Sequence, residues 1–571
     1  MPRRHVLFAA AVLLMTLVPQ ASFGHKERPS SSPPRPGSVP DVNRVHDLVI
    51  DVCKTGECAF ADIQAAVDAV PAGKVTPTLI RVWPGLYDEE PSRAVGELPA
   101  DNPDGTYSYN FQLTHPNVIN LIAIVGKKNV TVRGMGASPH DVVIDAAFKK
   151  HVGLRGDRSD GLILQNFAFY HAFEHGVYVM ETDGYVIDRV FSAYSQEYPF
   201  LTFADDHGLM INCEAIGGGD GGIYPGGSAD TPGRYSQEIS HCVSHHNVLG
   251  YSGTQGDHVW VHDSVFYDNA VGLVSDSETD HPNYPENNLI LERNRFHDNN
   301  FNPYLPTADV GPVEFDESGG GFNGTVIPVG VGVFLASGNE NLVQNNDIWG
   351  NDRYGVWLAS GEGLVVGPSS TPMAPPFASS GNRFIGNRMY GPAGVASPKL
   401  NGTDFAWDGM GLDNCWQDNV RSAAGDAVTT DALVLPPCRL PVATAPLPVG
   451  VPNPANAIAQ VGISKYNGKP MCFYLYLQPC VFGPGPAPGK ARNRPDGYQP
   501  PPAPAPCGPS TCAAAASAKH GPLVSPVTFH RGAPSDASTL PATGISGAPV
   551  ALVVLLLAGS AAGVYALVRR R

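Results

Sequence analysis

The stretch Gly161–Phe169 reads GLILQNFAF, and its pattern returns in Gly184–Ser192 (GYVIDRVFS) and Gly208–Ile216 (GLMINCEAI). In each stretch an alternating apolar strand is followed by a polar corner and then by a second short strand. Further units begin near Glu238, His258, Asn288, Glu340 and Asn382, and most units are roughly 22 to 30 residues long. A period of this length predicts a stack of structural repeats.

Each unit closes on a strand of the form Gly–apolar–x–apolar, as in Gly176–Val179 (GVYV) and Gly355–Leu358 (GVWL). The apolar inner face of one coil can be covered only by the next coil, so the coils stack into a solenoid. The leucine-rich repeat signature is missing, and Asn, Asp and Gly fill the corners. The sequence therefore predicts an all-β fold, a parallel β-helix over residues 45–435.

One column of the aligned units is rich in asparagine, whose side-chain amide can bond to its stacked copy and to the turn backbone. Two cysteines of neighbouring coils fall in this column. Because coils stack about 4.8 Å apart, they can form a cross-coil disulfide or remain two stacked buried thiols. The column contains Asn166, Arg189, Cys213, Cys242, Ser264, Asn294, Asn346 and Asn387.

Upstream of the repeat, Phe60–Asp68 (FADIQAAVD) has helical spacing, and Ile80–Glu89 (IRVWPGLYDE) is a strand that ends at a Pro–Gly turn. The two segments together resemble the N-terminal cap and first coil of the pectin lyase-like superfamily, and in particular the opening of pectin methylesterases. The resemblance implies a right-handed parallel β-helix with an N-terminal helical cap. It also implies that the partner is an extracellular polysaccharide, on which the protein would act as a lyase, a hydrolase or an epimerase.

The chemistry of the named families does not carry over. The later methylesterase motifs are missing from the sequence, so a pectin methylesterase is not expected. The string Trp260–Asp263 (WVHD) is not the W-I-D-H element of pectate lyases, and Asp205–Gly208 (DDHG) is not the D-P-H-D string of mannuronan epimerases. The resemblance therefore predicts the fold and leaves the reaction open.

Long insertions after several strands, at residues 225–235, 275–287 and 303–333, predict one wall of a groove along the sheet. Acid and imidazole groups there can divide proton donation and abstraction on a sugar chain, and loop carboxylates can hold Ca²⁺. Ordinary solvated turn residues and a non-catalytic, glycan-binding or adhesive surface are the alternatives. The predicted catalytic residues are Asp205, Asp206, His207, Asp257 and His258; the predicted substrate-binding residues are His175, Tyr178, Tyr224 and Tyr251; and the predicted Ca²⁺ ligands are Asp276, Glu278 and Asp280.

Both ends of the chain predict export and retention at the cell surface. Residues 1–24 have the layout of a signal peptide, with an apolar run too short to span a bilayer. The end of the chain carries Leu540, Pro541, Ala542, Thr543 and Gly544, then an apolar stretch of spanning length, then three arginines. Residues 540–571 thus resemble the cell-wall sorting signal of Gram-positive surface proteins. A sortase would join Thr543 to peptidoglycan, and a simple transmembrane tail anchor is the alternative.

Composition agrees with an extracellular protein that is expected to be a monomer. The formal charge is −16, or −16 − 5 = −21 without the five arginines of the removed ends, which argues against nucleic acid as a partner. The ten cysteines predict disulfides rather than a metal site. Residues 436–539 are rich in Pro, Ala and Gly and predict an extended stalk, with a small unit near residues 471–482. The predicted local pairs are Cys53 with Cys58, Cys415 with Cys438, Cys472 with Cys480, and Cys507 with Cys512.

Overall fold

The computed structural model contains two units, and the second, Val527–Arg571, lies outside the part that is described here. Also outside it lie residues 1–24 and 540–571, on which the predictions of a signal peptide and a sorting signal fall, and the predicted pair Cys472 and Cys480. Within the described part, no helix combines the length and the apolar character that crossing a bilayer requires. The described residues are 38–71, 73–88, 93–94, 119–172, 174–195, 197–228, 235–277, 283–301, 329–359, 379–395, 398–407, 409, 411–431, 435–438, 464–466, 469–471 and 500–512.

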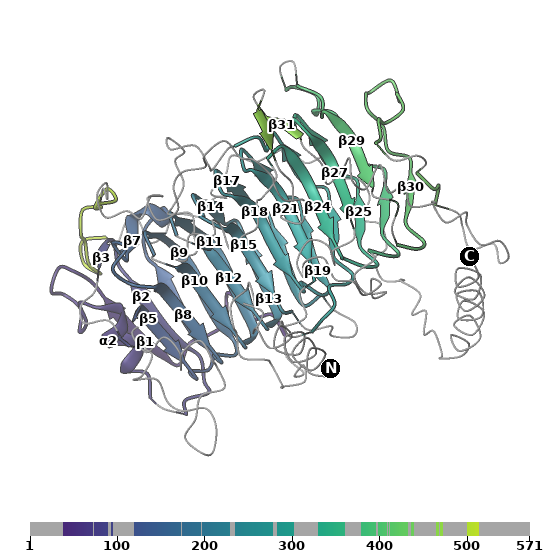
Figure 1. The fold of residues 1–571 in the computed structure, drawn as a ribbon. Helices are drawn as coiled ribbons and strands as arrows, with labels where there is room; N and C mark the ends of the chain where they lie inside the picture. Colours follow the sequence, from purple (N-terminus) through teal and green to yellow (C-terminus); the bar gives the residue numbers. More distant parts are fainter. Residues whose placement is uncertain are drawn as a thin grey trace, which may run out of the picture. The chain divides into compact units, whose positions relative to one another are not determined.

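Strands stack into three ladders, as the repeat predicts, and successive coils lie side by side along the solenoid (Figure 1). The pairing within the ladders is parallel except between β4 and β5. Each coil passes through the first, the second and then the third ladder. The first ladder contains β1 (Leu48–Val52), β2 (Thr78–Val82), β6 (Val130–Gly134), the front halves of β9 (Leu162–Tyr170) and β11 (Asp183–Ala193), β13 (Asp206–Ile211), β16 (Gln237–Ser240), β19 (Val259–His262), β22 (Ile290–Glu292), β25 (Leu342–Gln344), β28 (Arg383–Ile385) and β30 (Cys415–Gln417).

The second and third ladders complete each coil. The second contains β3 (Gly85–Tyr87), β7 (Val142–Asp145), the rear halves of β9 and β11, β14 (Glu214–Ile216), β17 (Val243–His245), β20 (Val265–Tyr267), β23 (Arg295–His297) and β26 (Asp347–Trp349). The third contains β4 (Arg93–Ala94), β5 (Ile119–Val125), β8 (Val152–Asp157), β10 (His175–Met180), β12 (Phe200–Phe203), β15 (Gly221–Gly226), β18 (Leu249–Thr254), β21 (Val271–Asp276), β24 (Val331–Ala336), β27 (Tyr354–Ala359) and β29 (Thr403–Trp407).

The core is the inside of the coil, where one apolar residue per strand lies on its copy in the next coil. Burying a side chain of this size contributes about 1.5–3 kcal/mol, so every added coil adds to the stability of its neighbours. The column in the first ladder is Ile187, Met210, Ile239, Val261, Leu291, Val343, Phe384 and Trp416.

The predicted asparagine column lies at the first corner, between the first and second ladders. The backbone N–H of Asn294 donates to Oδ1 of Asn346 (2.8 Å), and Asn346 donates in the same way to Asn387 (3.1 Å). The column is confirmed from Cys213 onward. The alignment is wrong by one residue at Asn166 and Arg189. Those two residues occupy the preceding left-handed position, because β9 and β11 continue through the corner as single strands.

The sequence alignment did not predict two further asparagine ladders that the structure contains. One lies between the second and third ladders and joins Asn247, Asn269, Asn299, Asn351 and Asn401. The other lies between the third and first ladders and joins Asn341, Asn382 and Asn414. The closing strands begin with Gly because a Cβ there would enter the ladder: at Gly222 it would lie 2.7 Å from Nδ2 of Asn247.

The helix α2 (Ile63–Asp68) packs on the first coils. Its Gln64 side chain accepts a hydrogen bond from the N–H of Ala123 (2.6 Å) and donates one to the carbonyl of the same residue (3.3 Å). Ala123 belongs to β5, so this amide satisfies backbone groups near the beginning of the third ladder.

Three of the predicted disulfides are present: Cys53–Cys58, Cys415–Cys438 and Cys507–Cys512. Cys213 and Cys242 are buried free thiols. The predicted cross-coil disulfide is therefore wrong for this structure, and the stacked-thiol alternative holds. Burial raises the pKa of the Cys213 thiol far above its usual value, and the contact with Cys242 adds to this effect.

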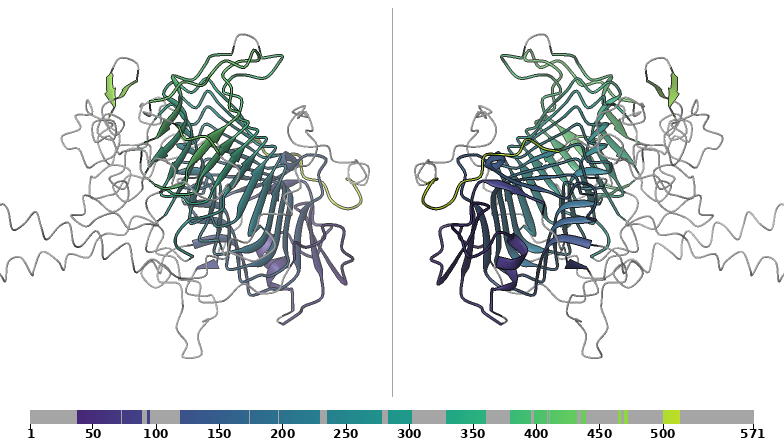
Figure 2. Two further views of the ribbon diagram at one scale, coloured as in Figure 1. Left: turned by 90° about the vertical axis from the view of Figure 1, so that its right-hand side faces the viewer. Right: turned by 90° about the vertical axis from the view of Figure 1, so that its left-hand side faces the viewer.

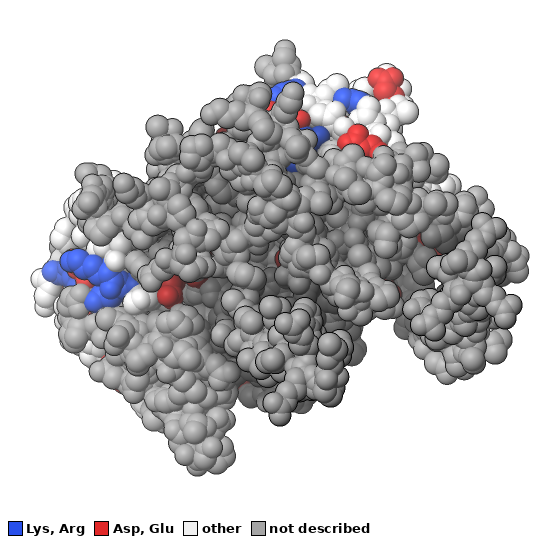
Figure 3. Space-filling view, in the orientation of Figure 1, with Lys and Arg blue, Asp and Glu red and all other residues white. Residues whose placement is uncertain are grey.

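Residues 500–512, which belong to the predicted stalk, lie against the first coils of the solenoid. Figure 2 shows this segment in yellow beside the purple strands. On the face shown in Figure 3, described basic side chains lie toward the two ends of the solenoid, each with acidic neighbours. Ion pairs of this kind also join neighbouring coils, as between Arg81 and Asp51 (2.6 Å).

Candidate functional site

The candidate site lies at the third corner, where the chain leaves the third ladder and enters the first. Most coils have one residue with a positive φ there, with the coil of Ser236 as an exception, and this conformation costs a residue with a Cβ about 1–2 kcal/mol. Most coils use Gly or Asn for it, whereas two coils use His207 (φ 51°) and His258 (φ 52°). The aligned residues of this column are Asn129, Gly161, Gly184, His207, His258, Asn288, Glu340, Gly381 and Asp413.

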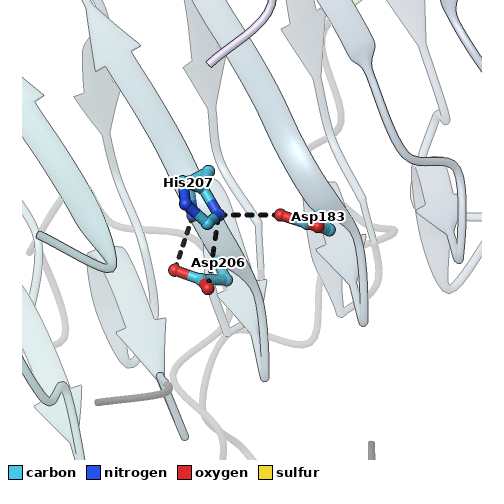
Figure 4. A group of neighbouring side chains, drawn as sticks. All are labelled: Asp183, Asp206 and His207. Carbon is cyan, nitrogen blue, oxygen red and sulfur yellow. Dashed lines mark hydrogen bonds and ion pairs between the residues drawn. The ribbon is translucent and has the colours of Figure 1, made fainter. Parts of the chain in front are cut away.

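The imidazole of His207 lies between two carboxylates (Figure 4). Its Nδ1 is 2.8 Å from Oδ1 of Asp183, at the start of β11 in the preceding coil, and 3.3 Å from Oδ2 of Asp206. The backbone N–H of His207 donates to Oδ1 of Asp206 (2.8 Å). Asp183 and Asp206 are direct register partners, so the parallel pairing of β11 and β13 brings them together. Sequence inspection selected Asp206 and His207 and missed Asp183.

The surroundings of Asp183 oppose its ionisation. Burial raises the pKa of Asp183, the hydrogen bond to His207 lowers it, and the charges of Asp206 and Asp160 raise it again. Asp160, one coil further back, forms an ion pair with Lys128 (2.6 Å). It also accepts the backbone N–H of Asp183 (3.1 Å). The third corner thus places three carboxylates of successive coils in line, with one lysine at the end.

Asp205 has another role than the predicted one at this corner. Its Oδ1 accepts the backbone N–H of Thr182 (2.7 Å), its Oδ2 accepts that of Phe203 (3.1 Å), and the residue is fully buried. Burial raises the pKa of this carboxyl far above its usual value. Both oxygens therefore serve the turn, and the side chain stabilises the backbone that presents His207.

Asp257 and His258 repeat the Asp–His pair two coils further on, which is about 10 Å along the solenoid. Oδ1 of Asp257 accepts the backbone N–H of Asn287 (2.6 Å). In the coil between the two pairs, Gln237 is the register partner of Gly208 and of Val259, and Tyr235, two residues earlier, corresponds to Asp206 and Asp257. The structure therefore does not join the two predicted pairs into one cluster, and a catalytic role of Asp257 and His258 stays a prediction.

The predicted substrate-binding residues lie elsewhere. His175 begins β10 and Asp206 follows β12, so they occupy opposite ends of the third ladder and not the one flank that the sequence predicted. Nδ1 of His175 lies 3.3 Å from Oε2 of Glu197. Tyr178 and Tyr224 point outward from this ladder within a buried cluster, whereas Tyr251 points into the core of the coil. All three tyrosines are at most 2% exposed.

The three long insertions, which the sequence predicted to form one wall of a groove, occur at two different corners of the solenoid. Residues 229–234 and 278–282 fall at the third corner, between β15 and β16 and between β21 and β22. Residues 302–328 instead fall between β23 and β24, at the corner of the second and third ladders. The insertions therefore do not leave equivalent strands, because the third follows a strand of the second ladder.

Among the described residues, one group is arranged as a metal ion would require. Ligand atoms of Asp183, Asp206 and His207 all lie within 4.8 Å of one another. Two carboxylates and one imidazole suit a transition-metal ion better than Ca²⁺, which prefers oxygen ligands only. Of the predicted Ca²⁺ ligands, Asp276 ends β21, and Glu278 and Asp280 lie outside the described residues.

A protonated Nδ1 that donates to Asp183 leaves Nε2 as the basic nitrogen of His207. The two carboxylates would stabilise the imidazolium formed after proton transfer, as in other carboxylate-oriented histidines. Proton transfer of this kind contributes about 10²–10⁴-fold to a rate. The arrangement is therefore suited to a general base or acid.

The architecture defines the class of protein as a right-handed parallel β-helix. Residues 281–391 match the family described as "Right handed beta helix region". No curated protein matches the sequence.

Among solved structures, the A-module of the Azotobacter vinelandii mannuronan C-5 epimerase AlgE4 is 14% identical, with a TM-score of 0.38, over 62% of this chain and 89% of that chain. Pectate lyase Pel9A is 14% identical, with a TM-score of 0.32, over 68% and 80%. Tailspike protein 3 of bacteriophage CBA120 is 13% identical, with a TM-score of 0.32, over 74% and 66%.

Proposed function

We propose that this protein is a cell-surface β-helix that acts on an extracellular polysaccharide, with His207 as the group that transfers the proton. The observation that carries the proposal is the position of the His207 imidazole, held by carboxylates of two successive coils. A histidine that replaces Gly or Asn at a left-handed corner has a conformational cost, and such costs concentrate at functional sites. Asp183 and Asp206 act as positioning residues for the ring.

The two ends of the chain belong to the same proposal. A cleaved signal peptide over residues 1–24 and a sorting signal over residues 540–571 would display the β-helix on the outer face of the envelope. Sortase and peptidoglycan are then the partners of the anchor, and the substrate must be a polymer that reaches the cell surface.

The test is a screen of polysaccharides with the soluble chain from residue 25 to residue 543. Unsaturated products that absorb in the near ultraviolet indicate a lyase, new reducing ends without them a hydrolase, and exchange of sugar protons with deuterated solvent without cleavage an epimerase. His207→Gln should remove the activity, whereas His241→Gln should keep it, because His241 has the same left-handed backbone (φ 54°) at another corner. Equal activity of His207→Gln and the unchanged protein would contradict the proposal.

A chelator separates proton transfer from metal chemistry at the same residues. Activity that survives EDTA supports His207 as a proton-transfer group, because the carboxylates then act on the ring directly. Activity that EDTA removes and Mn²⁺ or Zn²⁺ restores would instead make these three residues metal ligands.

A further inference from the structure

The chain returns to its own beginning after the last coil. Residues 500–512 pack on the first coils, where Cys512 is buried with Cys53 and Trp83, and Cys58 and Cys507 pack against them. Two small disulfide loops, Cys53–Cys58 and Cys507–Cys512, thus lie in one cluster although more than 440 residues separate them.

Hydrogen bonds fix the position of residues 500–512 on the first coils. The backbone N–H of Ser510 donates to Oε2 of Glu57 (3.0 Å), and its hydroxyl donates to the same oxygen. The N–H of Cys507 donates to the carbonyl of Pro84 (3.3 Å). The hydrogen bonds from Ser510 lower the pKa of Glu57, so this carboxylate is ionised and accepts them at neutral pH.

Gly508 allows the close approach of the two loops. A Cβ at this position would lie 2.6 Å from Oγ1 of Thr55 and 2.7 Å from Cδ of Glu57. Real Cβ atoms do not come this close, so a larger residue at position 508 must displace the side chains of Thr55 and Glu57, and with them the carboxylate that accepts the hydrogen bonds from Ser510.

We propose that residues 500–512 are a clip that fixes where the anchor leaves the solenoid and which end of the solenoid faces the cell. This inference rests on the proposed anchoring at Thr543. Without the clip, the 105 residues from Cys438 to the proposed attachment at Thr543 (543 − 438 = 105) allow an extended reach of about 330 Å. With the clip, only the 31 residues from Cys512 to Thr543 (543 − 512 = 31) remain, or about 100 Å. The first coil then faces the wall, and the last coil, about 50 Å further along the twelve-stranded first ladder, faces outward.

The docking itself is tested on the soluble chain from residue 25 to residue 543. Trypsin cuts after Arg492 and Lys519, and the peptide between them keeps its internal disulfide but no covalent bond to the β-helix. The peptide should coelute with the β-helix in size exclusion, and Gly508→Ala should release it. Ala505→Ser, at an exposed position of the same segment, should leave it bound. A peptide that elutes alone from the unchanged protein overturns the clip.

The orientation is tested on cells that carry the wall-linked protein. Val45 and Leu412 are 84% and 56% exposed near opposite ends of the solenoid, so Val45→Cys and Leu412→Cys accept fluorescent labels. The label at residue 45 should lie nearer the wall, and Gly508→Ala should remove this difference. Equal distances of the two labels in the unchanged protein overturn the orientation. Absence of wall-linked protein would instead overturn the anchoring proposal, while the coelution of the peptide would still support the clip.

Discussion

Asp206–His207 and Asp257–His258 are the same dipeptide at the same corner of the solenoid, two coils apart. Their histidines share one backbone conformation, with φ values of 51° and 52°. The difference lies in the neighbouring coils. Asp183 places a second carboxylate on the ring of His207, whereas Tyr235 is the corresponding residue before Asp257. In a solenoid, a residue about one coil away therefore decides whether a local motif becomes a cluster.

The largest difference between the Asp206–His207 pair and the Asp257–His258 pair is expected in kcat/KM. Asp183→Asn removes the carboxylate that orients His207 and stabilises the imidazolium, so kcat/KM should fall about 10²–10⁴-fold. Asp257→Asn keeps an acceptor oxygen for the N–H of Asn287 and should change kcat/KM less than about twofold. The measurement is kcat/KM against pH on the substrate from the screen. Loss of activity in Asp257→Asn alone would move the site to the second pair.

The next effect concerns the free energy of unfolding around the second pair. Glu286 precedes Asn287, is fully buried, and accepts a hydrogen bond from Asn341 (3.1 Å). Burial raises its pKa to about 8. A carboxyl with a raised pKa stabilises the fold below its unfolded pKa, and this stabilisation is lost as the pH rises to about 8.

Glu286→Gln should therefore be more stable than the unchanged protein at pH 9, by on the order of 4 kcal/mol, and close to it at pH 4. Chemical denaturation at both pH values measures this difference. Glu340→Gln, the same change at an exposed position, is the control and should show no such gain at pH 9. A pH-independent difference between Glu286→Gln and the unchanged protein would show that Glu286 is ionised in the fold.

The sequence predicted the repeat and most of its consequences. Alternating strands, the closing glycines and the asparagine column from Cys213 onward follow from short-range patterns, and so do three disulfides between cysteines close in sequence. The alignment is wrong by one residue at Asn166 and Arg189. The sequence pattern of a left-handed residue inside a continuous strand is the same as that of a residue in a turn.

The candidate site was only half predictable. Asp206 and His207 are adjacent in sequence, but Asp183 reaches them through the register of β11 and β13, which depends on aligning coils of unequal length. In the aligned units Asp160 and Asp183 fall in the column of His207, which pointed to this corner, but the structural register is shifted by one residue and pairs Asp183 with Asp206. The burial of Tyr178 and Tyr224 could not be foreseen, because their strand pattern alone does not say which outer face is covered.

A smaller effect, on the free energy of unfolding, is expected from removing the hydrogen bond between Asn287 and Asp257 of the second pair. Asp257→Ala leaves the N–H of Asn287 without its acceptor, which should cost about 1–3 kcal/mol of unfolding free energy. Asp257→Asn keeps an oxygen at the same place and should cost less than half as much. Denaturant titration of both variants measures this, and equal losses would show that the charge, not the hydrogen bond, stabilises the corner.

The smallest effect on turnover is expected from introducing a carboxylate at position 235, which corresponds to Asp183 of the first pair. Continuing the register of Gln237 and Val259 places Tyr235 beside Asp257, as Asp183 lies beside Asp206, so Tyr235→Asp adds next to Asp257 a carboxylate that corresponds to Asp183. In a His207→Gln background this change should restore at most about tenfold of the lost turnover, because the new centre lies two coils from the original one. Tyr235→Asn removes the same ring contact with Trp260 without adding charge and should restore nothing. If both changes restored turnover equally, loss of the tyrosine ring would be the cause, and the carboxylate from the preceding coil would not distinguish the two pairs.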